Sequence, residues 1–158
     1  MSRAFVKESD AEAIELPDRP ISPHPNLVTP AGLEAIEREL ARYQEAHAAA
    51  VAAADKAAIA AAQRELRYWS ARRASAQVID PPADASRVQF GATVTIRRQN
   101  GREAKARTQT FRIVGEDEAN PSQGTLSHVS PLARALYGKA VGDSVEIAGG
   151  EAEILAIR

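Results

Sequence analysis

One carboxylate in this chain stands apart by its surroundings. Asp55 is the only acidic residue of the alanine-dominated stretch 46–62, and Lys56 follows it directly. The next acids on either side, Glu45 and Glu65, are each ten residues away, which is about 15 Å along a helix. A hard divalent cation needs several oxygen ligands, so one carboxylate beside an ammonium group is a poor metal site. Capping the helix that follows is the better-supported role for Asp55.

Arginines form the second group with chemical potential, because guanidinium groups bind phosphates and carboxylates. The candidates are Arg64, Arg67, Arg72 and Arg73. They could contact nucleic acid or an acidic protein surface, but their aliphatic stems could also cover a thin alanine-rich seam, and we favour that role. Cysteine is absent and the three histidines are scattered. The sequence therefore excludes thiol chemistry and predicts no metal site or cofactor of its own.

Two helices are predicted to carry these residues. Thr29 before Pro30 is a helix start, and Pro81-Pro82 ends the helical region. Between them, two seams with spacings of three and four are out of phase, and the phase changes at Asp55-Lys56. The first is Leu33, Ile36, Leu40, Tyr43, His47, Ala50 and Ala54; the second is Ile59, Ala62, Leu66, Trp69, Arg73 and Ala76. We predict a helical hairpin over 29–79 with its turn at 55–56 and arms of about 36 Å. One continuous helix stays open as an alternative.

The regions on both sides of the hairpin differ in composition. Residues 1–28 carry four prolines and few apolar residues, which predicts a mobile tail. A docking arm anchored by Phe5 and Val6 is the alternative. From Val88 onward, apolar and polar residues alternate between Gly, Asn and Pro turns, as in antiparallel strands. Ser130, as an N-cap before Pro131, starts one short helix. The predicted class is α+β: an antiparallel coiled-coil hairpin followed by an antiparallel β domain over 80–158.

Several motifs in a fixed order resemble one known family. FGATVTI (90–96), FRIVGEDEA (111–119), SPLARAL (130–136) and VGDSVEI (141–147) look like the carboxy-terminal domain of the Gre transcript-cleavage factors. VTPAGLEAIERELA (28–41) and SAQVID (75–80) resemble the two ends of the family's coiled coil. The resemblance covers residues 27–158, and RELRYW (64–69) leans toward the GreB-type branch. Its strength comes from the order of the motifs, which is far more specific than any one of them.

The resemblance implies an FK506-binding-protein-like β domain that docks on bacterial RNA polymerase at the rim of its secondary channel. It also implies a coiled coil that enters this channel. In cleavage-active members, acids in a D-x-x-E-N-A-x-Y type segment at the tip help hold the catalytic magnesium. The docking candidates are Ser130, Pro131, Glu116, Asp117 and Glu118. The three acids would steer docking by charge. A plain helix start and a solvated acidic loop remain open as alternatives.

The tip of this chain departs from the family pattern. No E-N-A-x-Y segment occurs between Thr29 and Asp80, and the hairpin is shorter than in standard members by about two helical turns per arm. Asp55 alone remains as a weak candidate for contact with the polymerase magnesium. We therefore predict a Gre-like transcription elongation factor or regulator that binds RNA polymerase. It is not an enzyme itself, does not efficiently stimulate transcript cleavage, and contacts nascent RNA and DNA only indirectly.

Three other functions are compatible with parts of the same sequence. A Rnk-like regulator with a short coiled coil would also bind the polymerase. A peptidyl-prolyl isomerase would need an aromatic-lined pocket, and we expect Phe90 and Phe111 in the core. A structural coiled-coil dimer would require the break at 55–56 to be wrong, so we expect a monomer. With neither a signal-peptide-like start nor a membrane-length apolar run, we expect a cytoplasmic protein without a membrane partner.

Overall fold

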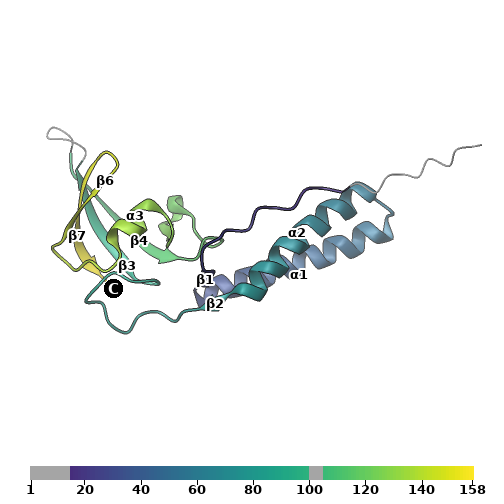
Figure 1. The fold of residues 1–158 in the computed structure, drawn as a ribbon, viewed down its shortest axis with the longest axis horizontal. Coiled ribbons are helices and arrows are strands. Elements are labelled where there is room, and N and C mark those ends of the chain that lie inside the picture. The colour runs from purple at the N-terminus through teal and green to yellow at the C-terminus, as the bar shows by residue number, and fades with distance from the viewer. Residues whose placement is uncertain (1–14, 100–104) are drawn as a thin grey trace, which may run out of the picture.

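The computed structural model describes residues 15–99 and 105–158. Helix α1 spans Pro30–Ala52 and helix α2 spans Lys56–Ser75. The two helices form a hairpin that projects from a curled β domain, as Figure 1 shows. This arrangement confirms the predicted α+β class with a helical hairpin ahead of the β domain. No helix among the described residues has the length and apolarity needed to cross a membrane.

The hairpin begins as the sequence predicts. Thr29 is the N-cap of α1 and its side chain accepts from the Gly32 N–H at 3.0 Å, while Pro30 occupies the first helical position. Helix α2 ends at Ser75, a few residues before the two prolines. The reason is that Gln77–Val78 forms a short strand, β2, which pairs in parallel with β1 (Leu27–Val28) at the base of the hairpin.

Most of the predicted seam is buried between the helices. Every first-seam residue from Leu33 to Ala50 is buried or half-buried, and Ala54 is exposed because it lies in the turn. The second seam holds from Ile59 to Trp69 and then shifts: Arg73 is exposed and Arg72 is buried. The shift arises because this end of α2 contacts the loop after β4 through Arg72.

Within its described residues, the β domain contains one five-stranded sheet in the order β5-β4-β3-β7-β6. Its elements are β3 (Thr93–Gln99), β4 (Arg107–Val114), a 3-10 turn (Pro121–Gln123), β5 (Thr125–Ser127), helix α3 (Pro131–Leu136), β6 (Ser144–Ile147) and β7 (Gly150–Ile157). Three of its four pairings are antiparallel as predicted, whereas β5 joins β4 in parallel, so the sheet is mixed. A parallel pairing is possible here because the chain makes a wide connection through the 3-10 turn before it returns.

Buried and more exposed side chains alternate along the strands, and the buried ones form the core of the β domain. On β3, Val94 and Ile96 are buried while Thr93 and Thr95 are half-buried on the other face, which is the period of two expected for a strand. Ala133 and Leu136 of α3 pack into the same core cluster. Helix α3 therefore closes one face of the sheet and places the loop that precedes it beside the hairpin base.

The segment before the hairpin is partly described. Residues 1–14, with the candidate anchors Phe5 and Val6, lie outside the described residues, so a mobile tail there stays a prediction. Residues 15–25, which we call the strap, run without helix or strand along α2, in purple in Figure 1. This placement resembles the docking-arm alternative. The boundaries at 28/29 and 79/80 between tail, hairpin and docking domain also stay predictions.

Candidate functional site

The tip of the hairpin is a tight turn capped by one carboxylate. Helix α1 ends at Ala52, Ala54 adopts the left-handed conformation with φ 51°, and Asp55 precedes α2. The Asp55 N–H donates to the Ala50 carbonyl oxygen at 3.0 Å. Its carboxylate accepts from the Ala58 N–H at 3.1 Å. The N-cap role of Asp55 is confirmed, and the turn occupies residues 53–55, slightly before the predicted position at 55–56 because Lys56 already belongs to α2.

The surface around the tip offers little further chemistry. All residues from 51 to 57 are exposed, and Asp55 and Lys56 are the only charged ones among them. Within 15–99 and 105–158, no three His, Cys, Asp or Glu side chains are grouped so as to hold a metal ion. Contact between Asp55 and a partner's magnesium ion stays a prediction.

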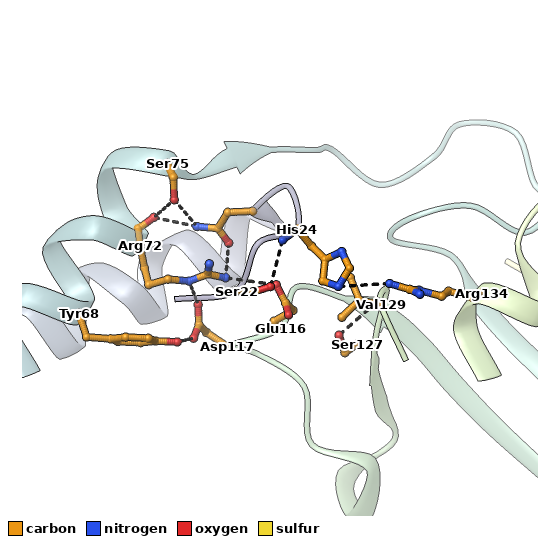
Figure 2. A network of polar contacts seen from close by, with 11 residues as sticks. Ser22, His24, Tyr68, Arg72, Ser75, Glu116, Asp117, Ser127, Val129 and Arg134 are labelled. Atoms are coloured by element: carbon orange, nitrogen blue, oxygen red, sulfur yellow. Dashed lines mark hydrogen bonds and ion pairs between the residues drawn. The ribbon is translucent and has the colours of Figure 1, made fainter. Parts of the chain in front are cut away.

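A buried arginine organises the opposite end of the hairpin. The Arg72 side chain is 2% exposed. Its Nε donates to Asp117 Oδ2 at 2.5 Å and its Nη2 donates to Asn26 Oδ1 at 2.7 Å. Asn26 in turn donates to the Arg72 carbonyl oxygen at 2.8 Å, and Glu116 places an oxygen 3.7 Å from Nη2. Figure 2 shows Arg72 reaching from α2 toward both carboxylates. A guanidinium is stable in such a buried place only because it is paired on several sides.

Tyr68 joins this network one turn earlier on α2. Its hydroxyl donates to Asp117. Burial, followed by the hydrogen bond to Asp117 and the charge of that carboxylate, raises the pKa of Tyr68 to about 12. Each of these causes disfavours the phenolate. Tyr68 therefore remains a hydrogen-bond donor throughout the neutral range, and Asp117 is held by two partners from the same helix.

Glu118 attaches the start of α1 to the same loop. The Thr29 hydroxyl donates to the Glu118 carboxylate, with 2.7 Å to each oxygen, and the N-terminal end of a helix favours a negative charge there. Gly32 makes room, because a Cβ at this position would lie 2.5 Å from Glu118 Oε2. At Gly115 a Cβ would lie 2.5 Å from the Leu27 carbonyl oxygen. Both helices are thus anchored to the loop that follows β4.

Two of the histidines, scattered in the sequence, share the neighbourhood of this loop. His24 Nε2 lies 3.2 Å from an Arg134 guanidinium nitrogen, and the His128 ring packs edge-on against Phe90 with 5.5 Å between centroids. Burial lowers the pKa of His128; His24 and Arg134 act in the same direction, while Glu116 opposes them. His128 is therefore a neutral, half-buried packing residue near pH 7.

The structure brings together residues that the sequence assigned to different surfaces. Glu116, Asp117 and Glu118 were expected as docking acids or as a solvated loop. Instead, all three carboxylates lie at the hairpin base, where Arg72 contacts the first two and Thr29 binds the third. Their use in steering a partner stays a prediction, but their first role is to hold the hairpin in place.

The other predicted arginines and the predicted docking loop also have contacts within the chain. Arg64 and Arg67 bind the strap, and Arg73 Nε donates to Glu37 at 2.8 Å. Ser130 caps α3 by accepting from the Ala133 N–H at 3.2 Å, and Pro131 is exposed beside it. The helix-start role of Ser130 and Pro131 is confirmed. Contact with a partner stays a prediction for all of these residues.

The aromatic residues of the β domain serve its core. Phe90 is 4% exposed and Phe111 packs against the core cluster, as predicted. The Tyr137 hydroxyl accepts from the Phe90 N–H at 2.7 Å. Phe90 and Phe111 therefore support the sheet, while Tyr137 is 41% exposed and ties the end of α3 to Phe90 through its hydroxyl.

Sequence reasoning missed Asn26 and the strap. Asn26 is 4% exposed and makes hydrogen bonds to Arg72 and Ser75. One usable signal was its place directly before the apolar pair 27–28 and the helix N-cap, where a buried approach to the helix is common. The other was the charged pair Asp18-Arg19, which complements Arg67 and Glu65 on the second arm.

Comparison with known proteins supports the resemblance described above. The family model for "Transcription elongation factor, GreA/GreB, C-term" matches residues 83–158. Transcription elongation factor GreA of Ruegeria pomeroyi is 36% identical over 152 residues, which cover 82% of this chain and 95% of that protein. GreA of Cereibacter sphaeroides (strain ATCC 17025) is 47% identical over 87 residues, 52% of this chain. That second match spans about half of the relative's length, 53%.

Solved structures were also matched. The crystal structure of the GreA factor homolog 1 (Gfh1) protein of Thermus thermophilus has a TM-score of 0.39 and 20% identity, covering 85% of this chain and 99% of that one. The assignment rests on the sequence relatives, because the match to the Ruegeria protein runs over nearly its whole length. The chain therefore belongs to the GreA/GreB family of transcription elongation factors.

Proposed function

We propose that this protein binds bacterial RNA polymerase as a monomer in the cytoplasm. The β domain docks at the rim of the secondary channel through the loop at Ser130 and Pro131, and the hairpin enters the channel. The protein acts through the polymerase rather than as an enzyme, contacts nascent RNA and DNA only indirectly, and does not efficiently stimulate transcript cleavage. Family membership supports the partner, while the length of the hairpin and the chemistry of its tip support entry into the channel and the lack of efficient cleavage.

The dimensions of the hairpin suit a narrow channel. Helices of 23 and 20 residues are about 35 Å and 30 Å long. Toward the tip the buried seam consists of small side chains such as Ala50, Ala60 and Ala62. Small seam residues let two helices approach closely, so the distal hairpin is slim as well as long.

The proposal that the protein does not efficiently stimulate cleavage rests on the chemistry of the tip. Asp55 is the only carboxylate there, it already accepts a backbone hydrogen bond, and Lys56 follows it. A magnesium ion shared with a partner would need carboxylate oxygens free to coordinate it. An N-cap carboxylate with an ammonium neighbour meets this need poorly.

A cleavage assay on backtracked polymerase complexes tests the proposal. We expect the protein to bind core RNA polymerase, to compete with a cleavage-active Gre factor, and to leave the length of the backtracked RNA unchanged. The matched variant is Asp55→Asn, which keeps the cap and removes the charge. Rapid RNA shortening by the wild type that Asp55→Asn abolishes would overturn the cleavage part. Failure to bind the polymerase would overturn the whole proposal.

A further inference from the structure

The proposed function assigns no role to the strap. It lies along α2 in an extended conformation, and its prolines are Pro17, Pro20, Pro23 and Pro25. Proline restricts the backbone to extended conformations before docking. Less conformational entropy is therefore lost when the strap binds the helix than for a flexible chain of the same length.

Arginines of α2 bind the backbone and one acid of the strap. Arg64 Nε donates to the Pro17 carbonyl oxygen at 2.8 Å. Arg67 donates to the Leu16 carbonyl oxygen at 3.3 Å and forms an ion pair with Asp18. Two arginines that could otherwise face a partner are thus occupied by the protein's own N-terminal segment.

Arg19 completes the contact from the side of the strap. Its guanidinium pairs with Glu65 at 2.7 Å and lies over the Tyr68 ring, 3.7 Å from the ring centroid. A cation over an aromatic face adds attraction to the ion pair. The strap and α2 therefore match each other in charge at two successive positions, Asp18 and Arg19.

These contacts hold the strap less firmly than the anchor at its end. The Arg67–Asp18 pair is largely exposed and Ile21 is 47% exposed. The Arg19–Glu65 pair and Leu16 are half-buried, and no strap residue from 15 to 25 is fully buried. Exposed ion pairs contribute little and weaken further in salt. Asn26, by contrast, is buried and tied to Arg72 and Ser75. The strap can leave α2 while the chain stays anchored at Asn26.

We propose that the strap is an autoinhibitory cover that occupies the α2 face in the free protein and leaves it when the hairpin enters RNA polymerase. This inference rests on the proposed function. A third chain along α2 thickens the hairpin at residues 64–68, and its hydrogen bonds and ion pair occupy donor groups of Arg64 and Arg67. Free energy spent on releasing the strap lowers the affinity of the protein for the polymerase.

A distance measurement tests release directly. The chain has no cysteine, so spin labels can be placed at Ile21→Cys in the strap and Gln44→Cys on α1, both exposed positions. We expect a narrow distance distribution in the free full-length protein and a broader, longer one with core RNA polymerase bound. An unchanged distribution in the complex would overturn the strap proposal and leave the proposed function standing.

Binding measurements test inhibition. The double variant Asp18→Arg/Arg19→Glu places like charges opposite Arg67 and Glu65, and we expect about fivefold tighter polymerase binding, equivalent to about 1 kcal/mol. The matched control is Glu39→Arg/Arg42→Glu, which swaps an exposed ion pair on α1 and should not tighten binding. Equal binding by wild type and the strap variant contradicts the inference alone. Absence of binding by all three proteins contradicts the proposed function as well.

Discussion

The two ends of the hairpin are held in different ways. Among the described residues, the Asp55 cap is the only side-chain hydrogen bond made by the turn, and the packing near the tip comes mainly from alanine methyl groups. At the base, Arg72 is enclosed by Asp117, Asn26 and Glu116. High helix propensity sustains the distal half with little packing, whereas the base depends on buried polar groups that are costly to leave unpaired.

The two ends of the hairpin therefore have different roles: the base sets its orientation, and the distal half sets its length. The base network ties both helices to one loop of the β domain, so it determines where the hairpin points. The distal half needs only to be helical and thin, so its side chains can be small and chemically inert. A protein of this kind can place a blunt tip at a defined position without carrying chemistry there. Substitutions at the two ends should therefore differ greatly in their effects.

The largest effect is expected at Arg72. Arg72→Met leaves buried Asn26 and half-buried Asp117 without the guanidinium, and removing one member of a buried ion pair costs about 3–5 kcal/mol. Denaturant unfolding measures the loss. The matched control is Arg73→Met, whose exposed pair with Glu37 contributes about 0–1 kcal/mol. Equal losses for the two variants would show that the base is not held by this network.

Tyr68→Phe should give the next largest loss, with a distinctive pH dependence. The hydrogen bond to the charged Asp117 contributes about 1.5–3 kcal/mol. Because folding raises the pKa of Tyr68 from 10.0 to about 12, its contribution is complete below pH 10 and is lost as the pH rises toward 12. Unfolding free energies of wild type and variant should converge over that interval. A constant difference would contradict the assignment.

At the tip, the effects should be smaller and local. Asp55→Ala removes the cap of α2 and should cost about 1 kcal/mol in thermal or denaturant unfolding. Asp55→Asn is the matched control, because asparagine caps a helix about as well as aspartate. If Asn and Ala are equally damaging, the charge of Asp55 matters for some reason other than capping.

The smallest predicted effect is a gain at Ala54. Its φ of 51° is a left-handed conformation that glycine adopts without a steric penalty, so Ala54→Gly should stabilise the hairpin by about 0.5–1 kcal/mol. Ala53→Gly, one residue earlier with φ −84°, should lower stability by about the same amount. Thermal unfolding of the pair checks the sign. Two changes of the same sign would contradict the strain at Ala54.

Local signals were sufficient for the outline of the fold. The Thr29-Pro30 start, the Asp55 cap and the Ser130 cap each depend on residues within three positions of one another. The apolar seams of the two helices are out of phase, and this change of phase located the hairpin turn. One continuous helix would carry a single seam in a constant phase. The alternation along β3 indicated which of its residues face the core.

The base of the hairpin was not predictable in the same way. Arg73 fits the heptad pattern and Arg72 does not, yet Arg72 is the buried residue. Its partner Asp117 is 45 positions away in the sequence and looked like part of a solvated acidic run. Heptad periodicity predicts which residues of one helix face another helix. It does not predict which residues are buried where the helix packs against a loop.

By itself, the sequence determined the two long helices, α3 and the main strands, their caps, the region of the turn at the tip and the near absence of chemistry there. These follow from interactions between residues close in the chain, whose energies depend little on the rest of the molecule. Only the tertiary structure decided that the acidic loop faces inward, that Arg72 is buried, and that the strap lies on α2. Those outcomes depend on pairing groups far apart in sequence, and burial makes such pairing compulsory once the segments meet.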